Sequence, residues 1–146
     1  MKTTYAEPVT KEVLLNAPAS KVWEAITDKN EMKQWYFDLA EFKAEVGFEF
    51  QFYGGDEKKQ WLHLCKVTEV IKEKKLIYSW KYESYGGISY VTFELFQEGN
   101  KTRLKLTHTG LESFPVDEVP EFKKENFVEG WNHIIGKSIK EFVERK

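Results

Sequence analysis

The spacing of apolar residues changes after a long central stretch of this chain, and that change constrains the fold more than any other feature. Between Gly47 and Thr109 apolar residues recur at every second position, which is the period of a β-strand. The stretch from residue 19 to residue 114 contains no proline, which suits a sheet because proline removes a backbone donor. After Pro120 the period becomes that of a helix. The pattern therefore predicts an antiparallel sheet followed by one long helix.

Turn-forming residues divide the sheet region into consecutive hairpins, which is typical of an antiparallel meander. We expect the turns at Gly54-Gly55, Lys72–Lys75, Gly86-Gly87 and Glu98–Asn100. The segment Trp61–Ile71 reads as a long strand with apolar residues on both faces. A β-bulge that exchanges the two faces part-way along the strand would explain this pattern.

The two ends of the chain complete an α+β architecture. A short strand is expected over Val9–Asn16, then a helix over Ala19–Thr27 that Pro18 opens, then a helical turn over Asn30–Gln34. The amphipathic helix after Pro120 spans roughly 25 residues. Since one sheet cannot bury its apolar face alone, this helix must lie across it. The strands twist, so the sheet curls around the helix and need not close completely on it.

Composition and charge limit the class of protein. We expect one domain, residues 1–146, in a water-soluble globular protein, since 41% of the residues are hydrophobic and 32% are charged. No apolar run is long enough to cross a membrane, and the N-terminus lacks a secretory signal, so a cytoplasmic location is expected. The net charge of −2 and the lack of a basic block argue against nucleic acid as a partner.

Aromatic residues make up 16% of the chain, and many of them fall on inward positions. These rings either fill the interior at normal packing density or line a cavity that buries an apolar ligand. The candidate cavity-lining residues are Trp35, Phe37, Phe50, Phe52, Tyr78, Trp80, Phe93, Leu106, His108, Phe127 and Trp131. Gly130 lies on the sheet-facing stripe of the helix, where a glycine costs about 1 kcal/mol relative to alanine. It permits either tight packing or a cavity at that point.

The sequence contains no readable catalytic constellation. His108 lies on the inward face of its strand, where it is either a hydrogen-bonded core residue or a ligand contact and general base. His63 and Cys65 share a strand face, but no second cysteine exists and His133 lies on the distant helix, so no metal centre is expected. No nucleophile elbow or phosphate-binding loop is present, and no cofactor is expected.

Several motifs, in order and spacing, resemble the SRPBCC or START-like superfamily, and within it the branch named for the activator of the heat-shock chaperone ATPase (AHSA-type). The motifs are Ala17-Pro18-x-x-x-Val22-Trp23-x-Ala25-x-Thr27-Asp28, Trp35-Tyr36-Phe37, Val46-Gly47-x-x-Phe50, Val67-x-Glu69-Val70, Leu76-x-Tyr78-x-Trp80, Thr102-x-Leu104-x-Leu106-Thr107-His108-x-Gly110 and Gly130-Trp131. The resemblance covers nearly the whole chain. It implies the helix-grip fold, in which an antiparallel sheet wraps around a C-terminal helix with a hydrophobic cavity between them.

Three functions follow as hypotheses. The first is non-enzymatic binding of a small hydrophobic or aromatic ligand in that cavity. The second, which the family's name suggests, is a protein-interaction module that contacts a chaperone. The third is an enzyme like the polyketide cyclases and aromatases of related fold, supported here only by His108 with Tyr78 or Tyr82. An exposed edge strand or the Trp35–Phe37 segment would supply the contacts of a homodimer.

Overall fold

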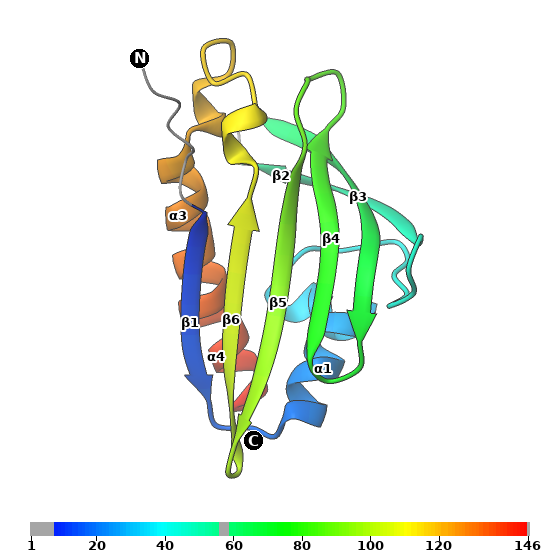
Figure 1. Cartoon of the computed structure of the whole chain (residues 1–146), viewed down its shortest axis with the longest axis vertical. Coiled ribbons are helices and arrows are strands. Elements are labelled where there is room, and N and C mark those ends of the chain that lie inside the picture. The colour runs from blue at the N-terminus through cyan, green and yellow to red at the C-terminus, as the bar shows by residue number, and fades with distance from the viewer. Residues whose placement is uncertain (1–7, 56–58, 146) are drawn as a thin grey trace.

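A computed structural model describes residues 8–55 and 59–145 and has six antiparallel strands in one curved sheet (Figure 1). The strands are β1 (Val9–Leu15), β2 (Glu49–Gly55), β3 (Gln60–Ile71), β4 (Lys75–Tyr82), β5 (Ser89–Glu98) and β6 (Lys101–Thr109). Their order across the sheet is β1-β6-β5-β4-β3-β2. Strands β2 to β6 thus form the predicted meander, and β1 pairs with β6 at the other edge.

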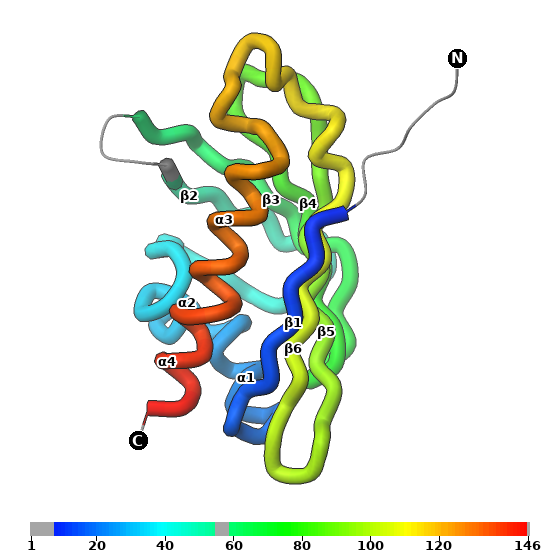
Figure 2. Tube along the Cα trace, turned by 90° about the vertical axis from the view of Figure 1, so that its left-hand side faces the viewer, coloured from blue at the N-terminus to red at the C-terminus, as the bar shows by residue number. Residues whose placement is uncertain are grey.

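Helices cover one face of the sheet. They are α1 (Ala19–Thr27), α2 (Lys29–Trp35), η1 (Leu111–Ser113), η2 (Pro120–Phe122), α3 (Lys124–His133), η3 (Ile134–Ser138) and α4 (Ile139–Val143). The last three follow one another without a break, with η3 a π-helical turn, and together we call them the C-terminal helix. Figure 2 shows this helix lying along the concave side of the sheet. The α+β fold with a long helix on an antiparallel sheet is therefore confirmed.

The C-terminal helix begins later than the sequence predicted. Pro120–Phe122 forms a separate 3₁₀ turn, and Lys123, with ψ 147°, is extended. The regular helix starts only at Lys124, which makes it shorter than expected. The helix predicted over Ala19–Thr27 has the expected bounds.

The expected bulge in β3 is confirmed. Val67 pairs with Tyr78 and Glu69 pairs with Ile77, so Thr68 is an extra residue between them. The extra residue exchanges the two faces of the strand. Val67 is buried before the bulge, and Val70 packs against the core after it.

The turn predicted at Gly54-Gly55 is wrong. Both glycines belong to β2, where Gly54 pairs with Trp61 and Gly55 with Gln60. The connection to β3 falls on residues 56–58, which lie outside the described residues.

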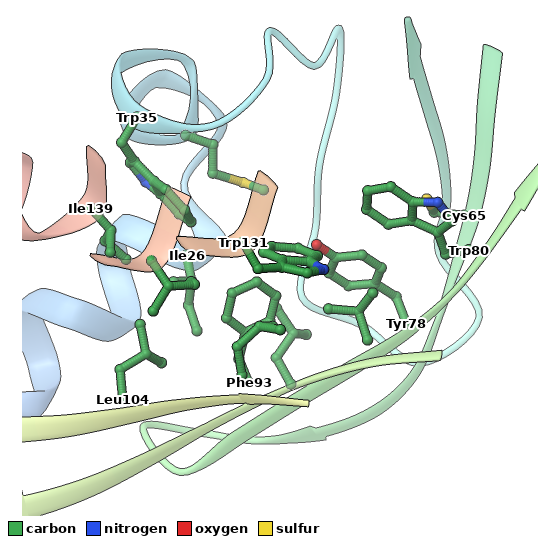
Figure 3. Packing of buried hydrophobic residues seen from close by; sticks show 14 of the residues in the cluster. Ile26, Trp35, Cys65, Tyr78, Trp80, Phe93, Leu104, Trp131 and Ile139 are labelled. Carbon is green, nitrogen blue, oxygen red and sulfur yellow. The ribbon is translucent and has the colours of Figure 1, made fainter. Parts of the chain in front are cut away.

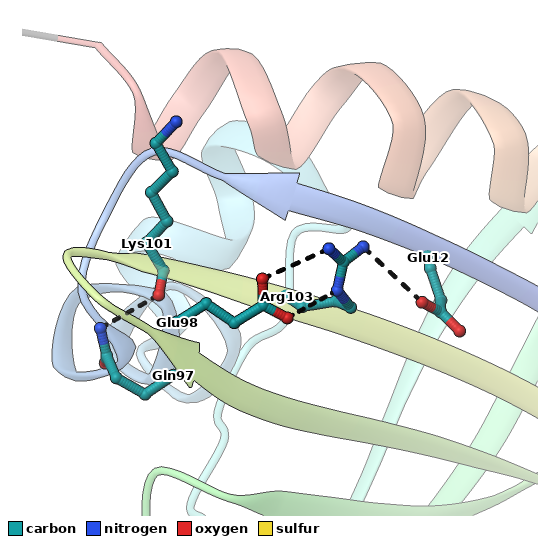
Figure 4. Close-up of polar contacts among 5 residues, drawn as sticks. All are labelled: Glu12, Gln97, Glu98, Lys101 and Arg103. Carbon is teal, nitrogen blue, oxygen red and sulfur yellow. Dashed lines mark hydrogen bonds and ion pairs between the residues drawn. The ribbon is translucent and has the colours of Figure 1, made fainter.

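The core lies between the sheet and the helices (Figure 3). Tyr78 and Phe93 point from the sheet toward Trp131 of the C-terminal helix, and all three are buried. The opposite face of the sheet is charged: Arg103 pairs with Glu98 at 2.8 Å and with Glu12 at 3.9 Å (Figure 4). No helix in the described part of the chain is long and apolar enough to cross a membrane.

The Trp35–Phe37 segment packs against the core, with Tyr36 and Phe37 partly buried. Trp35 is buried, and its indole nitrogen donates a hydrogen bond to the carbonyl of Ala25. The hydroxyls of Tyr36 and Tyr78 are hydrogen-bonded at 2.6 Å. Burial raises the pKa of both phenols well above the ordinary value, so both stay neutral.

Candidate functional site

A pocket of about 560 Å³ opens between the sheet and the first part of the C-terminal helix. Strands β2, β3 and β4 form one wall, and η2 and α3 form the other. The lining residues are Phe37, Gly54, Trp61, His63, Trp80, Tyr82, Glu121, Phe122, Asn126, Phe127, Glu129, Gly130, Trp131 and Ile134. Most of this surface is aromatic or aliphatic, with polar groups concentrated on η2 and α3.

Ring contacts hold the walls in place. Phe37 stacks on Phe52 with ring centres 4.3 Å apart, and Tyr82 stacks on Phe122 at 4.2 Å. The indole nitrogen of Trp80 donates a hydrogen bond to the Tyr82 hydroxyl over 3.0 Å. Such offset and edge contacts restrict ring rotation, so the pocket is largely formed in advance of any ligand.

Two glycines shape the pocket in different ways. A Cβ at Gly130 would meet no heavy atom within 4 Å, so this glycine is not needed for tight packing of helix on sheet. It faces the empty volume instead. At Gly54 a Cβ would lie 3.0 Å from Cε1 of His63 and 3.1 Å from Cε1 of Phe37, so any side chain there would crowd the two rings that form the wall.

His63 lies in the wall as a neutral ring. It stacks on Phe52 at 4.6 Å, and its Nδ1 is 2.9 Å from the carbonyl oxygen of Trp61. Burial lowers its pKa to about 4, and hydrogen bonding to the backbone of Trp61 and Phe52 opposes this only in part. At neutral pH the imidazole therefore adds an uncharged, polar surface to the pocket.

His108 lies behind the pocket wall with both ring nitrogens engaged. The indole nitrogen of Trp131 donates to Nδ1 over 3.0 Å, so Nδ1 is the acceptor and Nε2 carries the proton. Nε2 then donates to Oγ of Ser89 at 2.8 Å, and that hydroxyl donates to the carbonyl of Trp80 at 3.0 Å. Burial, with a smaller contribution from the charge of His63, lowers the pKa of His108 to about 3. This arrangement leaves no free nitrogen for proton transfer to a bound molecule.

The polar residues at the mouth are Glu121, Asn126 and Glu129, all exposed. Asn126 donates a hydrogen bond from its side-chain amide to the carbonyl of Glu121 over 2.9 Å. This bond ties the start of α3 to η2 and so fixes the spacing of the rim.

Of the eleven predicted cavity residues, four line the pocket: Phe37, Trp80, Phe127 and Trp131. The remaining seven, Trp35, Phe50, Phe52, Tyr78, Phe93, Leu106 and His108, belong to the packed core or lie behind the wall. The inward rings therefore fill the interior in one region and line a cavity in another. It is filled beside α1 and α2 and open beside η2 and α3.

Sequence reasoning missed a second group of lining residues. Tyr82 shares its strand face with Tyr78 and Trp80, and that alternation was available as a signal. Trp61 and His63 likewise share the inward face of β3. Glu121 and Phe122 gave no periodic signal, because η2 is a short turn and not part of the regular helix. Asn126 belongs to α3, but as a polar residue it was not part of the apolar pattern.

Comparison with known proteins agrees with this architecture. A family model described as "Activator of Hsp90 ATPase homolog 1-like protein" matches residues 16–144. The Hsp90 co-chaperone AHA1 of Saccharomyces cerevisiae is 27% identical over 122 residues, covering 78% of this chain. The match spans only 31% of the length of that yeast protein.

Two solved structures show how far the likeness in fold extends. Protein CV1439 of Chromobacterium violaceum superimposes with a TM-score of 0.78 at 19% identity, over 96% of this chain and 99% of its own. The solution structure of Bacillus halodurans protein BH1534 gives a TM-score of 0.73 at 27% identity, over 97% of this chain and 100% of its own.

Proposed function

The chain belongs to the family of activator of Hsp90 ATPase homolog 1-like proteins, and from this premise and its aromatic pocket we propose that it binds a small hydrophobic or aromatic ligand in the cytoplasm. The observation that carries the proposal is the pocket of about 560 Å³ between the sheet and the C-terminal helix. Its volume lies in the range of small-molecule sites, and its lining has their usual character, mostly apolar with a few polar groups.

The energetics of burial support binding at this place. A planar ligand against the pocket-facing sides of the Trp80 and Trp131 rings would remove apolar surface from water at about 25 cal/mol per Å². The walls are already held by ring stacking and by the hydrogen bond between Trp80 and Tyr82, so little ordering entropy is lost on binding.

We propose that the protein binds its ligand without converting it. His108 was the only candidate base, and its two nitrogens are occupied by Trp131 and Ser89. His63 is neutral and packed among rings. If replacing His108 with alanine abolished a measured turnover while ligand binding persisted, the enzyme hypothesis would return.

The test is a ligand panel measured on a pair of variants. Apolar and aromatic compounds are added to the purified protein, and binding is followed by melting temperature and tryptophan fluorescence. Gly130→Leu places a side chain in the pocket, while Asn132→Leu places the same side chain on an exposed position of the same helix. We expect at least one compound class to stabilise the parent protein and Asn132→Leu, and to lose at least about tenfold in affinity for Gly130→Leu. Equal binding to both variants, or no binding by any compound, would refute the proposal.

A second candidate is supported by the relationship to the yeast Hsp90 co-chaperone. On this hypothesis the chain contacts a heat-shock chaperone and changes its ATPase rate. The test is the ATPase rate of the host's Hsp90-type chaperone as this chain is added, with inhibited chaperone as the blank. No change in rate, together with no complex in analytical ultracentrifugation, would rule this candidate out.

A further inference from the structure

We propose that the pocket selects organic cations, namely amines or ammonium compounds with an apolar or aromatic body, over neutral and anionic molecules of the same shape. This inference rests on the proposed function, since it names the charge of the ligand that the same pocket would take.

The first support is the charge of the lining. Glu121 and Glu129 are the only charged side chains among the lining residues, because His63 is neutral at ordinary pH. Neither glutamate belongs to an ion pair within residues 8–55 and 59–145. Both carboxylates are thus available to a cation at the rim, and both repel an anion.

The second support is the ring content of the walls. Tryptophan faces attract cations most strongly among side chains, and Trp61, Trp80 and Trp131 all line this pocket. One of these rings already has a cationic neighbour: the Nζ atom of Lys59 lies 5.3 Å from the centre of the Trp61 ring. Clusters of aromatic faces are the arrangement by which proteins recognise alkylammonium groups.

Lys59 must be counted in the balance of charge near the pocket. It is not a lining residue, and its one positive charge stands against the two negative charges of Glu121 and Glu129. Among these three groups negative charge is in excess by one. We place the ligand's cationic group against the tryptophan faces on the side where η2 and α3 carry Glu121 and Glu129, and its apolar body against the rest of the aromatic wall.

The experiment compares three probes that share one ring system. They are 1-naphthylmethylamine, which is positively charged at neutral pH, 1-naphthalenemethanol, which is neutral, and 1-naphthoate, which is negative. Affinities are measured by tryptophan fluorescence at low ionic strength, where exposed charges are least screened. We expect the amine to bind about fivefold to tenfold more tightly than the alcohol, and the naphthoate to bind most weakly.

Charge-neutral variants show which groups cause the preference. Glu121→Gln with Glu129→Gln should bring the affinity of the amine close to that of the alcohol, leaving only the part of the preference that the tryptophan faces supply, and should leave the affinity of the alcohol unchanged. Glu125→Gln is the matched control, because Glu125 is an exposed glutamate of the same helix outside the pocket. It should retain the preference. The preference should also shrink as salt is added.

The outcomes separate this inference from the function on which it rests. If the alcohol binds as tightly as the amine and is displaced by Gly130→Leu, the pocket binds ligands but does not select cations, and the inference is wrong. If the control Glu125→Gln removes the preference as fully as the double variant, the effect belongs to overall charge and the inference is again wrong. If none of the three probes binds, while a broader panel finds another ligand for the pocket, the cation preference is refuted and the proposed ligand binding stands. Silence across the whole panel removes the proposed function as well.

Discussion

The indole nitrogen of Trp131 donates a hydrogen bond to Nδ1 of His108 over 3.0 Å. One face of Trp131 borders the pocket, whereas His108 is wholly buried in the sheet. The bond therefore joins the C-terminal helix to the sheet at the pocket's inner wall. It also fixes which nitrogen of His108 carries the proton.

Removing this bond should destabilise the protein. Trp131→Phe leaves Nδ1 of His108 buried without a partner, a loss of about 1–3 kcal/mol in addition to the smaller ring. Trp61→Phe is the matched control, because the Trp61 indole nitrogen is buried and has no hydrogen-bond partner among the described residues. Urea unfolding should show a larger loss for Trp131→Phe than for Trp61→Phe. Equal losses would mean that the bond contributes nothing to stability.

Acid should destabilise the protein from about pH 6.5 downward. Folding lowers the pKa of His63 from 6.5 to about 4 and that of His108 from 6.5 to about 3. Below pH 6.5 the unfolded chain binds these protons and the folded chain does not, so stability falls with pH until the folded pKa values are reached. Between pH 6.5 and pH 5 the two histidines together should remove roughly 3 kcal/mol of the free energy of unfolding. Urea unfolding at a series of pH values measures this slope.

Glu31 provides the control for that slope. Burial, with the neighbouring Glu24, raises the pKa of Glu31 from 4.5 to about 7, so the folded chain binds its proton more tightly and stability falls as pH rises between those values. This opposes the histidines. In Glu31→Gln the loss of stability on acidification should therefore be steeper than in the parent protein. A shallower slope in Glu31→Gln would contradict the raised pKa of Glu31 and would mean that this carboxyl group, and not the histidines alone, causes the loss of stability in acid.

The inward face of the sheet could be predicted from alternation alone. Tyr78 and Trp80 occupy every second position of β4, and a strand has no other way to place them than on one face. The bulge at Thr68 was also readable, because two apolar faces on one strand require an exchange. The wall made by η2 was not predictable, since Phe122 reaches the pocket through an irregular turn whose position depends on tertiary contacts with Tyr82 and Trp61.

The spacing of apolar residues also cannot predict whether inward rings pack against one another or leave a space between them. Phe50 and Trp80 both point inward, yet Phe50 packs edge-on against Tyr78 at 5.0 Å in the filled region, while Trp80 borders the pocket. The difference comes from what stands opposite each ring. Phe42 packs edge-on against Phe50 at 5.0 Å, whereas Trp80 shares the open pocket with Gly130, which has no side chain.

Adding a methyl group at Gly54 should strain the pocket wall. The new Cβ would press on His63 and Phe37 at 3.0 and 3.1 Å, closer than ordinary contact. We expect Gly54→Ala to lower the free energy of unfolding by about 1 kcal/mol through overpacking. Gly86→Ala is the comparison, because a Cβ there meets no heavy atom within 4 Å. If Gly54→Ala is as stable as Gly86→Ala, the side chains of His63 and Phe37 can move away from the new methyl group without cost, and the expected overpacking is refuted.

Replacing Gly130 with alanine should stabilise the protein and weaken ligand binding. Alanine at this helical position meets no neighbouring atom within 4 Å, so Gly130→Ala should raise the free energy of unfolding by up to about 1 kcal/mol through helix propensity. The added methyl group also narrows the pocket, and affinity for a bound aromatic compound should fall.

Gly136→Ala is the matched control for Gly130→Ala. It makes the same exchange farther along the C-terminal helix, where the Cβ would lie 3.3 Å from the flexible end of Lys11 and outside the pocket. Thermal unfolding and fluorescence titration on the two variants separate the effects, because only Gly130→Ala should change ligand affinity. If both variants bind as the parent protein does, Gly130 does not shape the binding site. In that case ligand binding would not explain why a glycine that destabilises the helix stands at this position.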